Sequence, residues 1–270
     1  MLLEALKHLL TPCPRPWRAM GYLREQIAID ARLGRHRSAW EPHLVASRAA
    51  ILEGASKCPR KRCAFVIGAG LHHDLPLAEL ARTFESVVLA DLVHCPSSRR
   101  AAKSCGPGVR CVEFDVSGVL LDLYRSAEIL SDEQAFELVS GARPGLPKIL
   151  GEEPDLVVSA NVCSQLMLLP ASWMVKKRAR YDDFARLLQI AGTRRHVEWL
   201  RERAGAQVFI TDVLRHQIDR SGVELERKEI VGLAGLRDAD RSWRWRIAPI
   251  PERDRNFHIE YTVAAWVGRL

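Results

Sequence analysis

Glycines, acids and histidines follow one another in a short stretch of the chain, directly after an apolar run. Residues 63–67 are apolar and lead into Gly68, Ala69 and Gly70. Glycine has no Cβ, so the backbone can turn sharply and approach a ligand closely there. A helix is expected after the turn, with Pro76 in its first turn, and free N–H groups at a helix start favour an anionic group. Strand, glycine turn and helix together predict a nucleotide-like binding site.

Two acids end the next two apolar runs. Asp91 follows the run 87–90 and lies about 20 positions after Gly70, where an acid in a Rossmann sheet accepts hydrogen bonds from both ribose hydroxyls. Asp115 follows the run 110–114 and could accept a bond from an adenine amino group while Val116 packs on the ring. The alternative for Asp115 is a helix cap or turn. The acids extend the predicted site to three strand ends.

The elements that must position these residues alternate along the chain. Apolar runs indicate buried parallel strands, and stretches with helical spacing lie between them. The last two runs alternate in hydropathy and suggest an antiparallel edge pair. The fold class is therefore α/β: a Rossmann-like, mostly parallel seven-stranded sheet with helices on both faces. The expected strands are 63–67, 87–90, 110–114, 155–160, 207–211, 243–247 and 259–263. Helices are expected to begin at Leu77 and Tyr181, and Gly192 is a candidate break in the second of them.

The amino-terminal part differs from the rest, because residues 1–57 show only helical patterns. Helices are expected up to residue 10, from 22 to 33, and from Pro42 onward. We expect a division into this segment and a Rossmann-like domain at 58–270. The segment would either cover the substrate pocket as a lid, lined by Tyr22, Trp40 and His43, or pack on a face of the sheet.

The strand-end motifs resemble those of class I S-adenosylmethionine-dependent methyltransferases. The resemblance covers residues 62–270 and rests on Gly68-Ala69-Gly70, Asp91, Asp115 and Ser159-Ala160-Asn161. It implies that S-adenosylmethionine binds here, with the glycine turn at its methionine end. By this resemblance Asp91 would bind the ribose hydroxyls, Asp115 and Val116 the adenine, and Asn161 would lie beside the sulfonium. The full set of expected cofactor-binding residues is Gly68, Ala69, Gly70, Asp91, Leu92, Asp115, Val116 and Asn161.

The chain departs from the family pattern in several places. Val66 stands where the family often has an acid, and His72 and His73 occupy the place of the usual third glycine, so the cofactor's amino group would be held differently. The N/D-P-P-Y motif of base N-methyltransferases is absent. His73 is the candidate general base, since imidazole titrates near neutral pH. Gln165 would orient a polar group of the substrate.

The seven cysteines are odd in number and form no CxxC pair, which argues against a disulfide framework and a structural zinc site. His72, His73 and His94-Cys95 show no usual ligand spacing, so no metal is expected. His196, Trp199 and His216 are further candidate pocket residues, with core packing the expected role of Trp199.

These features predict in-line methyl transfer to a small-molecule acceptor, in which the protein mainly supplies alignment and exclusion of water. The alternatives are an RNA or protein methyltransferase, an NAD-dependent oxidoreductase, a non-catalytic adenosyl-ligand-binding protein, and transfer of another group from the same cofactor. The net charge of +7, from 40 Lys and Arg against 33 Asp and Glu, leaves nucleic acid open as a partner. No run suits a membrane span and no signal-peptide layout is seen, so a cytoplasmic protein is expected.

Overall fold

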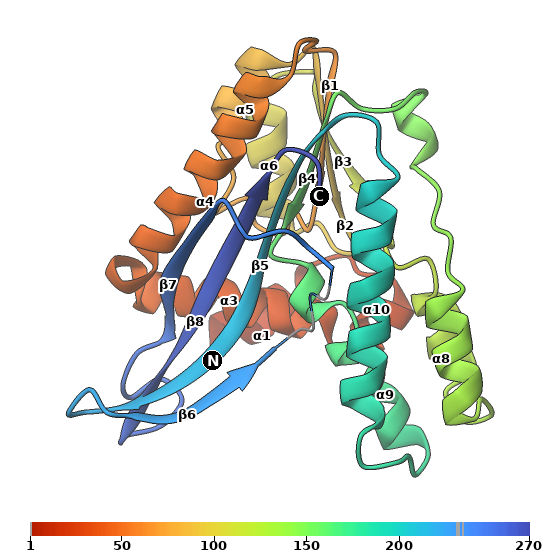
Figure 1. The fold of residues 1–270 in the computed structure, drawn as a ribbon, viewed down its shortest axis with the longest axis vertical. Coiled ribbons are helices and arrows are strands. Elements are labelled where there is room, and N and C mark those ends of the chain that lie inside the picture. Colours follow the sequence, from red (N-terminus) through yellow and green to blue (C-terminus); the bar gives the residue numbers. More distant parts are fainter. Residues whose placement is uncertain (1, 231–232, 234) are drawn as a thin grey trace.

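The computed structural model describes residues 2–230, 233 and 235–270. Its centre is one sheet in which eight strands are found in this part of the chain, in the order β3-β2-β1-β4-β5-β8-β7, with β6 paired to β5 (Figure 1). The strands are β1 (Cys63–Ile67), β2 (Ser86–Asp91), β3 (Val109–Glu113), β4 (Leu156–Ala160), β5 (Ala206–Asp219), β6 (Glu224–Glu229), β7 (Arg241–Ala248) and β8 (Phe257–Val267).

The predicted Rossmann-like fold is confirmed. The strands β3, β2, β1, β4 and β5 are parallel, and β8 and β7 form the expected antiparallel pair. β6 comes in addition to the seven expected strands. All six of its residues are exposed and most are charged, so it lacks the apolar pattern that marks a strand in the sequence.

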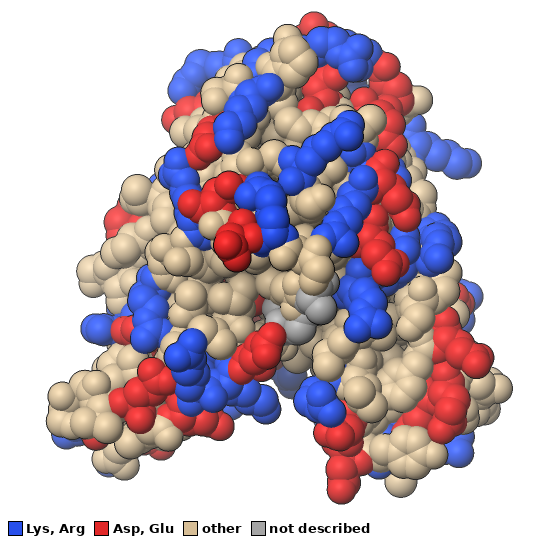
Figure 2. All heavy atoms as spheres, viewed as in Figure 1, with Lys and Arg blue, Asp and Glu red and all other residues tan. Residues whose placement is uncertain are grey.

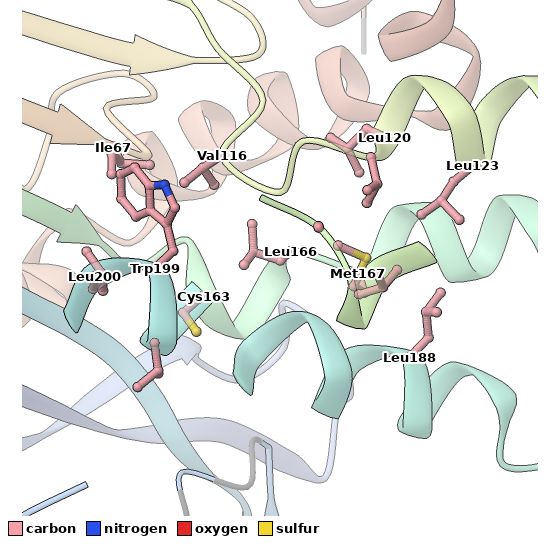
Figure 3. Packing of buried hydrophobic residues seen from close by; sticks show 14 of the residues in the cluster. Ile67, Val116, Leu120, Leu123, Cys163, Leu166, Met167, Leu188, Trp199 and Leu200 are labelled. Atoms are coloured by element: carbon pink, nitrogen blue, oxygen red, sulfur yellow. The ribbon is translucent and has the colours of Figure 1, made fainter. Parts of the chain in front are cut away.

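Helices cover both faces of the sheet, and each face has its own apolar core. The helices are α1 (Leu2–Leu10), α2 (Arg15–Met20), α3 (Tyr22–Arg35), α4 (Arg37–Lys57), α5 (Leu77–Thr83), α6 (Pro96–Ser104), α7 (Leu120–Arg125), α8 (Asp132–Ser140), α9 (Leu168–Lys177) and α10 (Phe184–Arg201), with 3₁₀ turns η1 (Lys148–Leu150) and η2 (Cys163–Gln165). Figure 3 shows the core under α10, where Ile67, Val116 and Trp199 belong to one cluster. Trp199 is 1% exposed and donates to the Pro144 carbonyl (2.7 Å), which confirms its expected role in the core.

Two helix predictions need correction. α4 begins at Arg37 and contains Pro42, whereas a start at Pro42 was expected. Proline removes only one helical hydrogen bond, and burial of this helix outweighs that loss. α10 runs unbroken through Gly192. A Cβ at this position would lie 2.6 Å from Met167, which explains the glycine. Gly192 therefore allows close packing and does not end the helix.

Of the amino-terminal helices, α1 and α3 lie across the carboxyl ends of the parallel strands, whereas α4 runs along the sheet beside β7 (Figure 1). Gln26 in α3 donates to the Val93 carbonyl (2.9 Å) and accepts from the Cys95 thiol (2.8 Å). These two bonds fasten α3 to the loop that follows β2. Whether residues 1–57 act as a separate segment stays a prediction.

Candidate functional site at the strand ends

The turn after β1 depends on glycine at two positions. Gly68 and Gly70 have φ angles of 74° and 48°, a region that side chains rarely adopt. A Cβ on Gly68 would also lie 2.7 Å from the Ala160 carbonyl oxygen of β4. The turn can thus approach the end of β4 only because residue 68 is glycine.

Asp91 faces this turn, as the sequence predicted. Its Oδ2 accepts from the Gly70 N–H (2.8 Å) and its Oδ1 accepts from the Leu92 N–H (2.7 Å). Burial raises the pKa of the Asp91 carboxyl, and the backbone donors at Gly70, Val93 and Leu92 act in the opposite direction. Three donated hydrogen bonds and one fixed orientation make this carboxylate a rigid acceptor beside the glycine turn.

Asp115 forms the cap that the sequence left open as an alternative. Its carboxylate accepts from the Ser117 N–H (2.9 Å), the Ser117 hydroxyl (2.6 Å) and the Leu120 N–H at the start of α7 (2.9 Å). Val116 is buried in the core next to it. The role of these two residues at an adenine ring stays a prediction.

A third polar link joins β1 to β4. The Asn161 side-chain amide donates to Asp74 Oδ2 (2.9 Å), and the Gln165 amide donates to the Asn161 carbonyl (3.1 Å). Asn161 itself has a positive φ of 52°, and its Oδ1 is buried without a hydrogen-bond partner among the described residues. Burial raises the pKa of the Asp74 carboxyl, which Asn161 partly counteracts. The site thus holds an acceptor that nothing within the described chain satisfies.

The two predicted catalytic residues lie at the edges of this arrangement. His73 Nε2 is 3.3 Å from Asp30 Oδ1 of α3, and the His73 carbonyl accepts from Arg48. Gln165 is exposed and touches Asn161 through its side chain. His73 is therefore engaged by the amino-terminal helices, and Gln165 is exposed with its amide bonded to the Asn161 carbonyl.

Tyr22 is the lid residue that lies near the predicted cofactor acids. Burial, and then the charges of Asp115 and Asp91, raise the pKa of its hydroxyl well above the usual value. This hydroxyl is buried and makes no hydrogen bond within the described chain. The start of α3 therefore presents an unsatisfied polar group between two strand ends.

Trp40 and His43 do not line the same place. Trp40 donates to the Ile247 carbonyl of β7 (3.1 Å), and His43 stacks on Trp245 (3.9 Å between ring centroids). Burial lowers the pKa of His43 to about 3. For these two residues the alternative, packing on a face of the sheet, is the correct one, because α4 lies along β7.

The remaining candidate histidines are not in the site. His196 bonds to Ser159 (2.8 Å) inside the core, where burial lowers its pKa to about 3. His216 lies on the distant half of β5 and contacts Thr262 (2.9 Å). His196 Nδ1 has no hydrogen-bond partner in the described part of the chain, and His216 Nδ1 lies 3.3 Å from Glu224 Oε2. Neither histidine lies at the ends of the parallel strands.

The parallel strands, closed by the reversed β8, have the arrangement that the resemblance predicts. The chain has a Rossmann-like fold. One similar solved structure is Burkholderia thailandensis 1,6-didemethyltoxoflavin-N1-methyltransferase, crystallised with 1,6-didemethyltoxoflavin and S-adenosylhomocysteine; it shares 15% sequence identity over 94% of this chain and 92% of its own, with a TM-score of 0.37. No family model and no curated protein sequence matches the chain. At these values the function must be argued from this chain's own residues.

Sequence reasoning missed Asp212, which follows the parallel part of β5. It is 3% exposed, its Oδ2 accepts from the Ser164 hydroxyl (3.1 Å), and its Oδ1 has no partner in the described part of the chain. Burial raises its pKa to about 7. The Asn161 N–H donates to the Ile210 carbonyl (3.0 Å), so β5 near Asp212 runs beside Asn161. The sequence does place Asp212 directly after the apolar run 207–211, as Asp91 follows the run 87–90, and this position could have identified it as a site residue.

α5 begins at Leu77, as the sequence predicted, after a loop that carries His72, His73 and Asp74. Whether the start of this helix binds an anionic group stays a prediction. Among the described helices, none has the length and apolar character to cross a membrane.

Proposed function

We propose that the protein is an S-adenosylmethionine-dependent methyltransferase that acts on a small-molecule acceptor by in-line transfer. The observation that carries this proposal is the bond from the Gly70 N–H to Asp91 (2.8 Å). It holds a carboxylate against a turn of two left-handed glycines, where a ribose diol would find two acceptor atoms. Asp74 and the Asn161 Oδ1 would bind the methionine end of the cofactor.

Several features favour this cofactor over a nicotinamide dinucleotide. A dinucleotide fold has two halves of parallel strands, whereas here β8 runs antiparallel next to β5. A pyrophosphate also needs donors at a helix start, and this loop offers the Asp74 carboxylate before α5 begins. Two negative groups would repel each other across a partly desolvated site.

The same acceptors suit a cationic ligand. We infer that Asp74 and the unpaired Oδ1 of Asn161 hold the amino group of the methionine arm, in place of the acid that the family often has at the position of Val66. A buried acceptor gains most from a charged donor. Ala69 would then face the arm through its backbone, and Leu92 and Val116 would flank the adenosine, with Asp115 at the adenine.

The chain's own residues would align and deprotonate the acceptor. Bound S-adenosylmethionine supplies a methyl group that is already activated by the positive sulfur, so a base is needed only for a protonated acceptor. Asp212 is our first candidate, since a pKa of about 7 lets it accept a proton near neutral pH. His73 and Gln165 would act at the rim, His73 as a second base candidate and Gln165 as a hydrogen-bonding group for the acceptor.

A small molecule is the proposed acceptor because α3 lies over the strand ends and is fastened there by Gln26. In Figure 2 the lysines and arginines alternate with acids over the visible face and do not gather into one basic patch. Such mixing favours a solvated surface over a nucleic-acid track. We further propose that the part of residues 1–57 that lies over the strand ends, with α3, acts as a lid, and that the protein is cytoplasmic.

Calorimetry with S-adenosylmethionine, S-adenosylhomocysteine and NAD tests the cofactor. We expect the two adenosyl ligands to bind with a one-to-one ratio and NAD to give no heat of binding. Binding of NAD alone would reject the proposal. Incubation with labelled S-adenosylmethionine and fractions of cell extract then tests catalysis, and a product mass increased by one methyl group separates methyl transfer from transfer of the aminocarboxypropyl arm.

A further inference from the structure

Three side chains that can bind a metal meet behind the glycine turn. They are His72 from the loop after β1, His94 from the loop after β2, and Cys111 on β3. One ligand atom of each lies within 4.8 Å of the other two. They are separated widely in sequence, which is why spacing did not reveal them.

His72 is held in an unfavourable state in the absence of a partner. It is 8% exposed, and neither ring nitrogen has a hydrogen-bond partner among the described residues. Its φ of 65° is rare for a residue with a side chain. Buried unpaired polar groups and left-handed backbone conformations both destabilise a fold and often mark ligand sites.

His94 is oriented like a metal ligand. Its Nε2–H donates to the Val112 carbonyl (2.8 Å), which leaves Nδ1 as the nitrogen with a free lone pair. That Nδ1 is buried and unpaired in the described chain. A histidine that binds a metal through one ring nitrogen usually donates a hydrogen bond from its other ring nitrogen, often to a backbone carbonyl.

Cys111 supplies the third donor and an entrance. It lines a surface hollow of about 450 Å³ between α6 and β3, together with Arg99 and Lys103. Burial raises the pKa of the Cys111 thiol and the charge of Arg99 opposes that rise, so the thiolate form would come with metal binding. An ion can reach the thiol through this hollow. Cys95 and His73, which lie next to His94 and His72 in the sequence, have other partners: Cys95 donates to Gln26, and His73 contacts Asp30.

We propose that His72, His94 and Cys111 bind one zinc ion. Two imidazoles and a thiolate suit zinc, and three protein ligands leave the fourth position of a tetrahedral site for water. Zinc bonds of about 2.0 Å to nitrogen and 2.3 Å to sulfur would draw the three atoms to roughly 3.5 Å apart. Small side-chain rotations would therefore close the site.

The ion would stabilise the cofactor cradle. His72 stands two residues after Gly70, and His94 stands three residues after Asp91, so one ion would tie both loops to β3. The Gly70 carbonyl already accepts from Ser98 of α6 (3.0 Å), on the same side of the turn. Zinc binding is expected to raise the melting temperature, because the site exists only in the folded chain.

Metal analysis of the full-length protein tests the proposal. We expect about one zinc per chain after purification without chelators, and cobalt substitution should give a thiolate-to-cobalt absorption band. Cys111→Ser should abolish that band. Loss of a residue that only contacts a metal ligand lowers metal affinity by up to about 100-fold, so loss of the ligand itself should lower zinc affinity by more than that. Cys105→Ser, at a half-buried cysteine outside the cluster, is the matched control and should keep the metal.

A second variant remains informative if Cys111→Ser fails to fold. His72→Gly removes a ligand and also relieves the left-handed strain, so the metal-free variant should fold at least as well as the metal-free wild type. It should lose zinc and lose the thermal shift on zinc addition. Absence of bound zinc and of a cobalt band in the wild type, or unchanged metal content in both ligand variants, would overturn the proposal. Calorimetry with adenosyl ligands reports separately on the proposed function.

Discussion

The two halves of the strand-end site differ in how their polar groups are satisfied. On the β1–β2 side, Asp91 accepts three backbone hydrogen bonds and is fixed in place. On the β4–β5 side, Asn161 Oδ1 and Asp212 Oδ1 are buried and unpaired within the described residues. The first half resembles a preorganised binding cradle, and the second retains groups available for a reactant. The difference suggests that binding and chemistry are divided between the halves.

Replacement of Asp212 should have the largest effect on catalysis. Asp212→Asn keeps the shape but removes the base, so methyl transfer should fall by about 10²–10⁴-fold. Transfer of label into an extract fraction that the wild type methylates measures this. Asp122→Asn, at an exposed acid of α7, should be neutral. A variant that retains wild-type rates would remove Asp212 from the chemistry.

Asp212 should also give a pH signature. The folded protein holds its proton up to about pH 7, whereas an unfolded Asp releases it near pH 4. Folding therefore takes up a proton in this window, and stability should fall as the pH rises through it, by at most about 1.4 kcal/mol per pH unit. Other buried acids and histidines titrate in both proteins, so denaturant unfolding should show a steeper fall of stability with pH in the wild type than in Asp212→Asn, and the difference reports Asp212. Activity should rise over the same range as the carboxylate ionises.

Replacement of Asp91 should affect binding and not chemistry. Asp91→Ala removes both acceptors of the ribose diol, so affinity for S-adenosylhomocysteine should fall by at least about 100-fold. Calorimetric titration with S-adenosylhomocysteine measures this affinity, with Asp122→Ala as the control variant and circular dichroism as a check of folding. Equal affinities for the two variants would show that the adenosyl group binds elsewhere.

The glycine turn can be tested through stability. Gly68→Ala adds a Cβ within 2.7 Å of the Ala160 carbonyl at a φ of 74° and should cost about 2–4 kcal/mol of unfolding free energy. Gly145→Ala, which has nothing within 4 Å of the new atom, should change little. Urea unfolding distinguishes them, and similar midpoints would contradict the close approach of β1 and β4.

The smallest effect is expected at Tyr22. Tyr22→Phe removes an unpaired buried hydroxyl, so the ligand-free protein should keep or slightly gain stability, by up to about 1 kcal/mol. Affinity for S-adenosylhomocysteine should fall less than tenfold if the hydroxyl contacts the ligand. A variant that binds as tightly as the wild type would place Tyr22 in packing alone and weaken the lid proposal.

Local sequence patterns determined much of this protein. Apolar runs and glycine identified β1 to β4, the turn at Gly68 and the acid Asp91, because these depend on backbone freedom and on residues near each other in the chain. Only the tertiary structure decided which distant side chains meet. His72, His94 and Cys111 come together because parallel pairing aligns the ends of β1 and β2 with β3, and Asp212 acquires its raised pKa only through burial. The spacing of residues along the chain predicts neither which side chains meet across strands nor which carboxyl groups lose contact with water, because both are decided when separate elements pack.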